Sequence, residues 1–314
     1  MLVCEGDNIF DKQVINLVDH LNEGDLLIFN DAKVIKAKLT GTIKRNSAIL
    51  EFNLDQINDG IWNALCKPAK KVEKGDEIVI SDEFMAMVHE KNNDGTISIE
   101  FNAKDDEFIA LLEKFGEVPL PPYIKRGKEE GDVENYQTIY AKSGYAVAAP
   151  TAGLHFSDAI FAALKKKKIN TAFVTLNVGA GTFLPVRSDH LEDHKMHFEY
   201  FNLPEETAEI INKTKRENKR VIAVGTTSLR VLESSSTKKG VVKAGSKNTD
   251  IFIYPPFDFQ IIDGLMTNFH LPKSTLFMLI CAFIGQDKAF MLYEHAIKEN
   301  YRFYSYGDPT LLLP

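Results

Sequence analysis

Short segments in which apolar and polar residues alternate fill the chain between about Val34 and Phe101. Turn signals such as Asn58-Asp59-Gly60 and Asn93-Asp94-Gly95 separate them. A period of two is typical of strands that bury one face, and frequent tight turns favour antiparallel pairing. The pattern therefore predicts an antiparallel barrel or sandwich. The predicted strands are Ile35–Ile43, Ala48–Leu54, Ile61–Cys66, Glu77–Ile80, Met85–Glu90 and Thr96–Phe101.

The pattern differs on both sides of this region. Phe10–Leu21 has apolar residues at helical spacing, and Leu26–Phe29 is an apolar run typical of a buried strand. After Pro150, helical and strand patterns follow one another, which predicts an α/β arrangement. The predicted elements there are helices at Ser157–Lys168, Pro204–Arg216, Lys273–Phe283 and Ala289–Glu299, a further helix after Gly225–Ser228, and strands at Ile169–Val178, Arg220–Val224 and Thr249–Tyr254.

Together these patterns predict two domains, one inserted into the other. The proline-rich segment at residues 119–122 closes the all-β block as a stiff linker. We expect an α/β domain at residues 1–33 and 119–314 and an all-β domain at residues 34–118. A chain of 314 residues is long enough for two cores.

The composition bears on the cellular compartment in which the protein acts. No apolar run reaches the roughly 18 residues of a membrane span, and the first residues lack the pattern of a signal peptide. The three cysteines are far apart, which favours neither a disulfide framework nor a cysteine zinc site. We therefore expect a cytoplasmic protein that does not contact a membrane.

The formal charge of −7 argues weakly against a nucleic-acid partner, but binding can be local. Basic side chains cluster in several places and could form a face that contacts phosphates. The alternative is that such clusters are solvated surface. The clusters nearest the predicted barrel include Lys67 and Lys70, and then Lys125 and Arg126.

Several loops are rich in small, hydroxyl and imidazole side chains where a plain core would be aliphatic. Three of them enter predicted helices, whose N-terminal N–H groups can hold an anion. His155, in the first loop, could act as an acid or base, or could be a satisfied buried histidine in a capped turn. The loops are Ala148–Phe156, Val178–Phe183, Gly225–Arg230, Thr267–Leu276 and Tyr301–Asp308.

Three familiar ligand motifs fit these loops poorly. Gly179-Ala180-Gly181 lacks the third glycine and the acidic partner of a dinucleotide site, and Gly225–Ser228 lacks the Walker lysine. The spacing His190-x3-His194-x2-His197-x-Glu199 could ligate zinc, but the charged residues within it favour a polar loop beside a cleft.

Read together, the loops resemble one family: the S-adenosylmethionine:tRNA ribosyltransferase-isomerases of the queuosine pathway. The resemblance covers about residues 24 to 308. Matching strings include GDLLIFNDAKVIKAKL, EVPLPPYIKR, VAAPTAGLHFS, VGAGTFLPVR, VIAVGTTSLRVLE, DGLMTNFHLPKSTLFMLI and YRFYSYGD. Family members usually begin further upstream, so the resemblance implies a misplaced start or a shortened gene.

The resemblance implies a mixed-sheet α/β main domain carrying a small six-stranded antiparallel β-barrel. It also implies the reaction. The ribosyl part of S-adenosylmethionine is transferred to 7-aminomethyl-7-deazaguanine at the wobble position of tRNA and rearranged to an epoxycyclopentanediol, while adenine and methionine leave. S-adenosylmethionine is then a co-substrate, the second partner is tRNA, no metal or true cofactor is required, and we expect a monomer.

The resemblance and the loop chemistry together assign candidate roles. His155 and His270 are acid or base candidates, and Asp308 is an orienting residue or second base. The residues expected to hold S-adenosylmethionine are Thr151, Gly153, Gly179, Gly181, Thr182, Gly225, Thr226, Thr227, Ser228 and Arg230, the last by pairing with its carboxylate. The residues expected to contact the deazaguanine or tRNA phosphates are Asn30, Asp31, Lys67, Lys70, Lys125 and Arg126.

Two other functions fit the same residues. One is a binding module that holds tRNA or S-adenosylmethionine without turnover. The other is a methyltransferase, although the chain lacks the glycine-rich strand-to-helix motif with its acidic partner. Only the ribosyl transferase releases free adenine, so the products distinguish all three.

Overall fold

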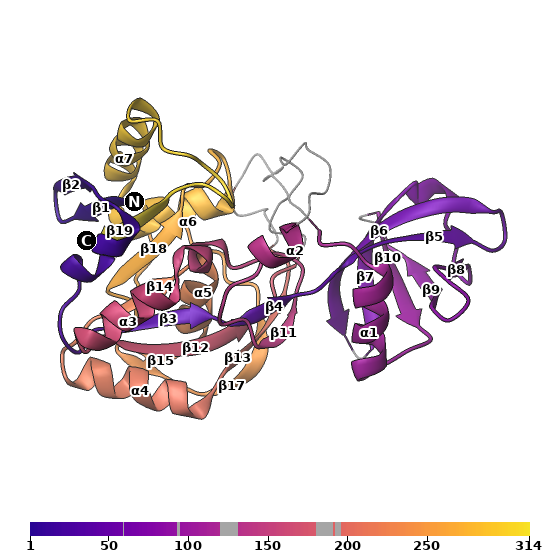
Figure 1. Cartoon of the computed structure of the whole chain (residues 1–314), viewed down its shortest axis with the longest axis horizontal. Helices are drawn as coiled ribbons and strands as arrows, with labels where there is room; N and C mark the ends of the chain where they lie inside the picture. The colour runs from indigo at the N-terminus through magenta and orange to yellow at the C-terminus, as the bar shows by residue number, and fades with distance from the viewer. Residues whose placement is uncertain (59, 93–94, 120–130, 180–190, 192–195) are drawn as a thin grey trace.

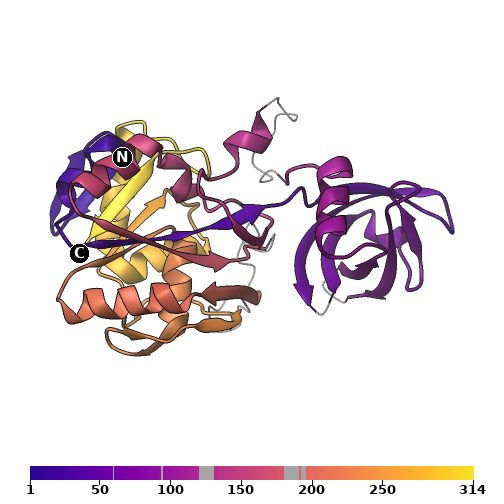
Figure 2. The same cartoon turned by 60° about the horizontal axis from the view of Figure 1, so that its bottom comes forward.

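The computed structural model describes residues 1–58, 60–92, 95–119, 131–179, 191 and 196–314. In the part described, a nine-stranded mixed sheet with helices on both faces lies beside a closed six-stranded antiparallel barrel (Figures 1 and 2). The predicted fold class, α/β with an inserted antiparallel barrel, is confirmed. The exact domain boundaries stay a prediction.

The sheet has a parallel centre and antiparallel edges. Its strand order is β17-β13-β12-β3-β14-β18-β19-β1-β2. Strands β12, β3, β14 and β18 pair in parallel, whereas β18 with β19, β12 with β13, β13 with β17 and β1 with β2 are antiparallel. The strands are β1 (Leu2–Glu5), β2 (Asn8–Asp11), β3 (Leu26–Asn30), β12 (Asn170–Leu176), β13 (Glu199–Leu203), β14 (Val221–Val224), β17 (Gly245–Thr249), β18 (Gly264–Asn268) and β19 (Pro309–Leu313).

Strand β3 shows why the centre of the sheet reads as continuous apolar sequence. Leu26 and Ile28 join the core on one face, while Leu27 and Phe29 join the core on the other. A strand covered on both faces needs apolar residues at every position. Helix α3 (Asp158–Lys166) covers one face, and the helices on the other are α4 (Glu205–Arg216), α5 (Thr226–Ser235), α6 (Thr275–Ile284) and α7 (Gln286–Lys298).

The barrel follows the alternating pattern of its sequence. Its order is β10-β7-β6-β5-β8-β9, and in β6 every second side chain from Ala48 to Leu54 is buried. Helix α1 (Asp105–Phe115) packs Phe108 and Leu112 into the barrel core and was not predicted. The barrel strands are β5 (Lys38–Ile43), β6 (Ala48–Asn58), β7 (Ile61–Lys67), β8 (Glu77–Val79), β9 (Met85–Lys91) and β10 (Thr96–Phe101).

Short elements connect and border these two parts. Strand β4 (Ala32–Val34) pairs with β11 (Ser143–Ala146) where the chain enters the barrel region. The predicted helix at Phe10–Leu21 is instead strand β2 followed by the 3-10 helix η1 (Val14–His20), and the predicted strand at Thr249–Tyr254 is wrong beyond Thr249, where β17 ends. The remaining elements are η2 (Ala69–Lys71), α2 (Asp132–Asn135), η3 (Thr151–His155), β15 (Ser236–Lys238) and β16 (Val241–Val242).

Candidate active site at the carboxyl ends of the parallel strands

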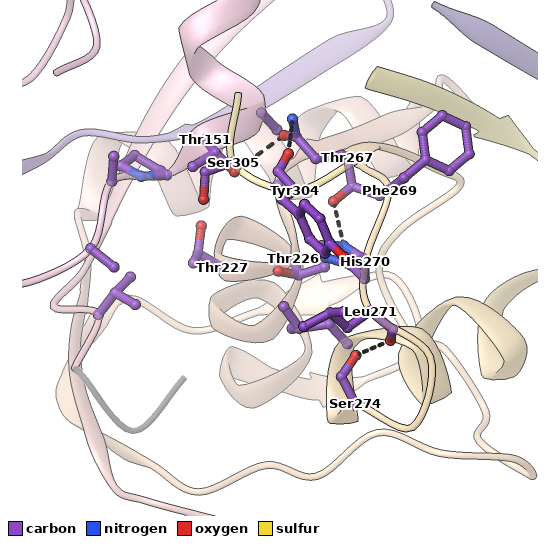
Figure 3. A pocket seen from close by; sticks show the side chains of 18 of the residues that line it. Thr151, Thr226, Thr227, Thr267, Phe269, His270, Leu271, Ser274, Tyr304 and Ser305 are labelled. Carbon is purple, nitrogen blue, oxygen red and sulfur yellow. Dashed lines mark hydrogen bonds between the residues drawn. The ribbon is translucent and has the colours of Figure 1, made fainter. Parts of the chain in front are cut away.

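A cavity of about 480 Å³ lies where β14 and β18 end, the edge of a parallel sheet at which ligands usually bind (Figure 3). Its size suits a small-molecule ligand. Segments far apart in the sequence form its wall. They are Ala148–Ala152, Val178, Gly225–Thr227, Thr267–Ser274, Leu276, Tyr304 and Ser305.

The N-terminus of α5 contributes hydrogen-bond donors to this wall. Gly225 has a φ of +90°, a conformation that favours glycine, and it turns the chain from β14 into the helix. The first backbone N–H groups of a helix have no partner within it and carry the positive end of the helix dipole. The Thr227 hydroxyl lines the cavity, is buried and has no hydrogen-bond partner among the described residues. This corner can therefore bind an anion or hydroxyl groups.

His270 brings an imidazole to the cavity wall just after β18. Its Nε2 lies 3.0 Å from the Thr267 hydroxyl (Figure 3). Its backbone N–H donates to the Tyr293 hydroxyl at 3.0 Å. Burial lowers the pKa of His270 to about 4. The ring is therefore neutral at physiological pH, and a neutral imidazole can accept a proton.

His155 lies behind the wall rather than on it. It ends the short helix η3, and its Nε2 is 3.3 Å from the amide nitrogen of Asn268. Burial lowers the pKa of His155 to about 4, although nearby Asp308 acts in the opposite direction. Both histidines predicted to exchange protons are therefore neutral near pH 7, but only His270 lines the cavity.

A buried ion pair anchors the chain where it leaves β12. Arg230 of α5 is 6% exposed and Glu199 of β13 is 3% exposed, and the guanidinium Nη1 donates to the carboxylate Oε2. The second oxygen, Oε1, accepts from the Gly179 N–H at 3.2 Å. Nε and Nη2 of Arg230 have no hydrogen-bond partner among the described residues. The pair thus fixes the position of Gly179, which follows the cavity residue Val178.

Comparison with known proteins gives one consistent result. The sequence profile of the family described as "Queuosine biosynthesis protein" matches residues 1–312. A Rickettsia bellii S-adenosylmethionine:tRNA ribosyltransferase-isomerase is 49% identical over 99% of this chain and 91% of its own length. The protein of that name from Dinoroseobacter shibae is 47% identical over 100% of this chain and 91% of its own.

The chain belongs to the queuosine biosynthesis protein family.

A crystal structure agrees with this assignment to the queuosine biosynthesis family. The S-adenosylmethionine tRNA ribosyltransferase of Thermotoga maritima is 33% identical, with a TM-score of 0.54, over 99% of this chain and 91% of that one. The resemblance inferred from the sequence strings is confirmed.

The structure brings some of the expected ligand residues together. Thr151, Gly225, Thr226, Thr227 and His270 all line the cavity. They come from η3, the β14–α5 turn and the segment after β18. Their role in binding S-adenosylmethionine stays a prediction, but their convergence is what that prediction requires.

Other expected residues lie outside the cavity wall and contact protein groups. A Cβ at Gly153 would meet the Tyr140 hydroxyl at 1.9 Å, and the Ser228 hydroxyl donates to the Val224 carbonyl at 2.8 Å. Asp308 accepts from the Arg302 guanidinium at 2.9 Å, which lowers the pKa of the carboxyl. Arg230 is held by Glu199, so its guanidinium does not reach the cavity as the sequence-based role required.

The expected contacts of Gly179, Asn30 and Asp31 are likewise with protein. A Cβ at Gly179 would meet Oδ1 of Asp55 in barrel strand β6 at 2.4 Å, so it is the barrel that approaches this glycine closely. The Asn30 side chain bonds to both backbone groups of Leu176, and the Asp31 carboxylate accepts from the Thr175 hydroxyl at 2.6 Å. These contacts join β3 to β12.

The remaining expected residues are either exposed or outside the described part. Lys67 and Lys70 are exposed on the barrel and on η2, and their contact with tRNA phosphates stays a prediction. Gly181, Thr182, Lys125 and Arg126 lie outside the described residues. The same holds for His190 and His194 of the zinc alternative.

Sequence reasoning missed two residues that stand out in the structure. Asn268 is the buried last residue of β18 and bonds to two other segments, η3 and the segment that contains Tyr304. Lys273 is the one Lys, Arg, Asp or Glu among the described residues that line the cavity. The signal was the polar string at Thr267–Ser274, which was noted as a donor-rich loop but not resolved into individual roles.

Two absences concern the described residues only. No group of three or more His, Cys, Asp or Glu side chains there is arranged to hold a metal ion, and the expectation that no metal is needed stays a prediction. No single described helix is long and apolar enough to cross a membrane, although the bent pair α6–α7 meets that test by length and composition.

Proposed function

We propose that this chain transfers the ribosyl moiety of S-adenosylmethionine to tRNA and isomerises it. The acceptor is 7-aminomethyl-7-deazaguanine at the wobble position, and the products are epoxyqueuosine-tRNA, adenine and methionine. Relatives that are 47–50% identical over nearly the whole chain are named S-adenosylmethionine:tRNA ribosyltransferase-isomerases. The observation that carries the proposal to particular residues is the cavity in which family-specific segments converge.

The wall chemistry suits the co-substrate. Thr227 and the N-terminal N–H groups of α5 bind ribose hydroxyls or the methionine carboxylate. Lys273 supplies the cationic partner for that carboxylate, the role first expected of Arg230. Gly179, Gly181 and Thr182 remain candidates for holding the methionine carboxylate or the ribose.

Proton transfer is the chemical demand that the site must meet. The sulfonium acidifies the C5′ proton of the ribose, a base must remove it, and the departing adenine must receive a proton. In this proposal neutral His270, on the cavity wall, accepts the C5′ proton. Asp308 acts through His155 as an orienting charge, since its carboxylate raises the pKa of that imidazole against the effect of burial.

The tRNA occupies the side of the molecule that carries the barrel. Lys67 and Lys70, with Lys125 and Arg126, contact phosphates, which position the anticodon without reading its sequence. Asn30 and Asp31 lie at the entry to the barrel region and support the acceptor base indirectly. The enzyme acts as a cytoplasmic monomer and needs no cofactor besides the co-substrate S-adenosylmethionine.

A product assay tests the proposal. The full chain is incubated with S-adenosylmethionine labelled in the ribose and with tRNA carrying 7-aminomethyl-7-deazaguanine. We expect label in the tRNA and one free adenine and one methionine for each modified tRNA. S-adenosylhomocysteine as product would indicate a methyltransferase, and binding without adenine release would indicate a binding module. Either result overturns the proposal.

A matched pair of variants ties the assay to the cavity. His270→Ala removes the imidazole on the wall, and His295→Ala removes a histidine on α7 that bonds to Asp11 away from the cavity. We expect adenine release to be lost only in the first. Equal activities would remove His270 from the reaction.

A further inference from the structure

Asn268 joins strand β18 to two other segments of the chain, η3 and the segment Tyr304–Gly307, through one buried amide. It is 2% exposed at the end of β18. Its Oδ1 lies 3.1 Å from the Thr151 hydroxyl. Its Nδ2 lies 3.3 Å from Nε2 of His155, 3.2 Å from the Tyr304 carbonyl and 3.3 Å from the Gly307 carbonyl.

These partners decide which way the amide faces. A backbone carbonyl can only accept a hydrogen bond, so the side of the amide that meets Tyr304 and Gly307 must be the NH2 group. The opposite side must be the oxygen, and the Thr151 hydroxyl can donate to it. The orientation therefore follows from the two carbonyls and does not depend on distinguishing nitrogen from oxygen by position.

We infer that Asn268 is a positioning residue that holds His155 as the tautomer with its proton on Nδ1. The amide NH2 group has two hydrogens for three acceptors, the Tyr304 and Gly307 carbonyls and Nε2, so one hydrogen is shared. It can point at Nε2 only if that ring nitrogen carries no proton, because two N–H groups would otherwise face each other at 3.3 Å. The neutral ring must then carry its one proton on Nδ1.

This arrangement limits what His155 can do in the reaction. This consequence rests on the proposed function. Nε2 is occupied, so His155 cannot serve as a base through that atom. Nδ1–H remains as a donor, so His155 acts as a hydrogen-bond donor behind the cavity wall and leaves proton abstraction to His270. Burial is the largest effect on the pKa of His155 and lowers it. Among the charged groups, Asp308 raises this pKa, whereas the N-terminal ammonium and Arg302 lower it.

The same amide also determines the direction in which the Thr151 hydroxyl donates its hydrogen bond. The hydroxyl has one proton, and that proton goes to Oδ1 of Asn268. Because Thr151 lines the cavity, it presents only lone pairs to a ligand. A bound molecule must therefore donate at this point, as a ribose hydroxyl does.

The tautomer can be measured without substrate. In the full chain labelled with 15N-histidine, two-bond 1H–15N correlations identify the protonated nitrogen of each ring, and His155→Gln assigns the His155 signals. We expect the Nδ1–H form of His155 at pH 7. Finding the Nε2–H form or an imidazolium would overturn the inference. This result is independent of turnover, so a failure of the proposed function would leave it intact.

Variants test whether Asn268 determines the tautomer of His155. In Asn268→Ala we expect His155 to show a mixture of tautomers, with a kcat about 100-fold lower. Asn268→Asp replaces the donor with a carboxylate, so the proton should move to Nε2 and the pKa of His155 should rise by about 1 to 3. Thr151→Val removes the other partner and should leave the tautomer unchanged while KM rises.

Thermal unfolding of each variant shows whether the fold is intact. If folded Asn268→Ala keeps the pure Nδ1–H form and the wild-type kcat, the positioning role is excluded. If Asn268→Asp is unstable, because its carboxylate faces two carbonyls, Asn268→Ala alone decides.

Discussion

The two ends of the parallel strands use polar residues in opposite ways. At the amino ends, carboxylates complete their bonds within the protein. Asp25, 1% exposed before β3, accepts from Arg220 at 2.6 Å and from the Asn22 N–H at 2.7 Å. Asp263, before β18, accepts from Lys215 and from the Val221 N–H. These groups tie strands together and leave little for a ligand.

At the carboxyl ends the polar groups are left open to a cavity. The Thr227 hydroxyl is buried without a partner among the described residues, and His270 is held neutral on the wall. A buried group without a partner costs stability that a bound ligand can restore. The contrast shows that the candidate site differs from the rest of the sheet in where buried polar groups lack a hydrogen-bond partner, rather than in how many polar residues it has.

The largest expected effect is on catalysis. His270→Ala should lower kcat/KM for S-adenosylmethionine by about 10²- to 10⁴-fold, because a positioned acid or base contributes that much. Single-turnover adenine release measures it. If kcat/KM fell by less than threefold, a group other than His270 would have to remove the C5′ proton.

The Glu199–Arg230 ion pair combines features of both ends of the strands. It is buried and bonded within the protein, as at the amino ends, but it also holds Gly179, which follows the cavity residue Val178. Glu199→Ala leaves Arg230 buried without its charge partner and should lower the free energy of unfolding by about 3 to 5 kcal/mol. Urea denaturation measures this change. The double variant Glu199→Leu with Arg230→Met should recover most of the stability, because no buried charge remains.

At the amino ends, Asp25→Ala should act on stability alone. Losing the partner of Arg220 should cost about 2 to 3 kcal/mol, less than a fully buried pair since the Arg220 side chain is 27% exposed. Adenine release per folded molecule should stay at the wild-type value. Lower activity at full folding would mean that the two ends are coupled.

Acid should weaken the fold through the two histidines. Burial lowers the pKa of both His155 and His270 to about 4, below the ordinary 6.5. Between these values the unfolded chain binds protons that the folded chain does not, so stability is complete above pH 6.5 and falls as the pH drops towards 4. Each histidine should contribute about 1 kcal/mol of loss per pH unit. His270→Gln should reduce the slope in denaturation curves between pH 6.5 and 5, and an unchanged slope would contradict the shift.

The smallest expected effect separates binding from folding. Thr227→Val removes a buried hydroxyl that has no partner in the described part of the free protein, so stability should not fall. The KM for S-adenosylmethionine should rise about tenfold, the value of about one hydrogen bond. If stability fell and KM stayed constant, Thr227 would belong to the scaffold.

The sequence predicts the barrel better than the site for physical reasons. Alternation in segments such as Ala48–Leu54 directly reports strands with one buried face, so each barrel strand was expected near its observed place. Strands β18 and β19 are buried at every position, so they show no period of two. Unlike β3, they also bury the polar residues Thr267, Asn268 and Thr310, which interrupt the apolar run, and they were missed. Family resemblance supplied the closed barrel and the reaction.

The roles of site residues are harder to predict from the sequence, because tertiary partners decide them. Arg230 lies about one turn from the N-terminus of α5 and was expected to bind a carboxylate, and in the fold it pairs with Glu199. Asn268 was one polar residue among several in its loop, and only the folded chain places its amide between Thr151 and His155. Residue type predicts which chemistry is possible, and the fold selects the partner.

A crystal structure of the full chain with S-adenosylmethionine tests the central claim most directly. The account predicts the nucleoside in the cavity at the carboxyl ends of β14 and β18, in contact with Thr227 and His270 and with a ribose hydroxyl donating to Thr151. Binding elsewhere, for example in the basic hollow beside Lys215 and Lys238, with that cavity empty would contradict it.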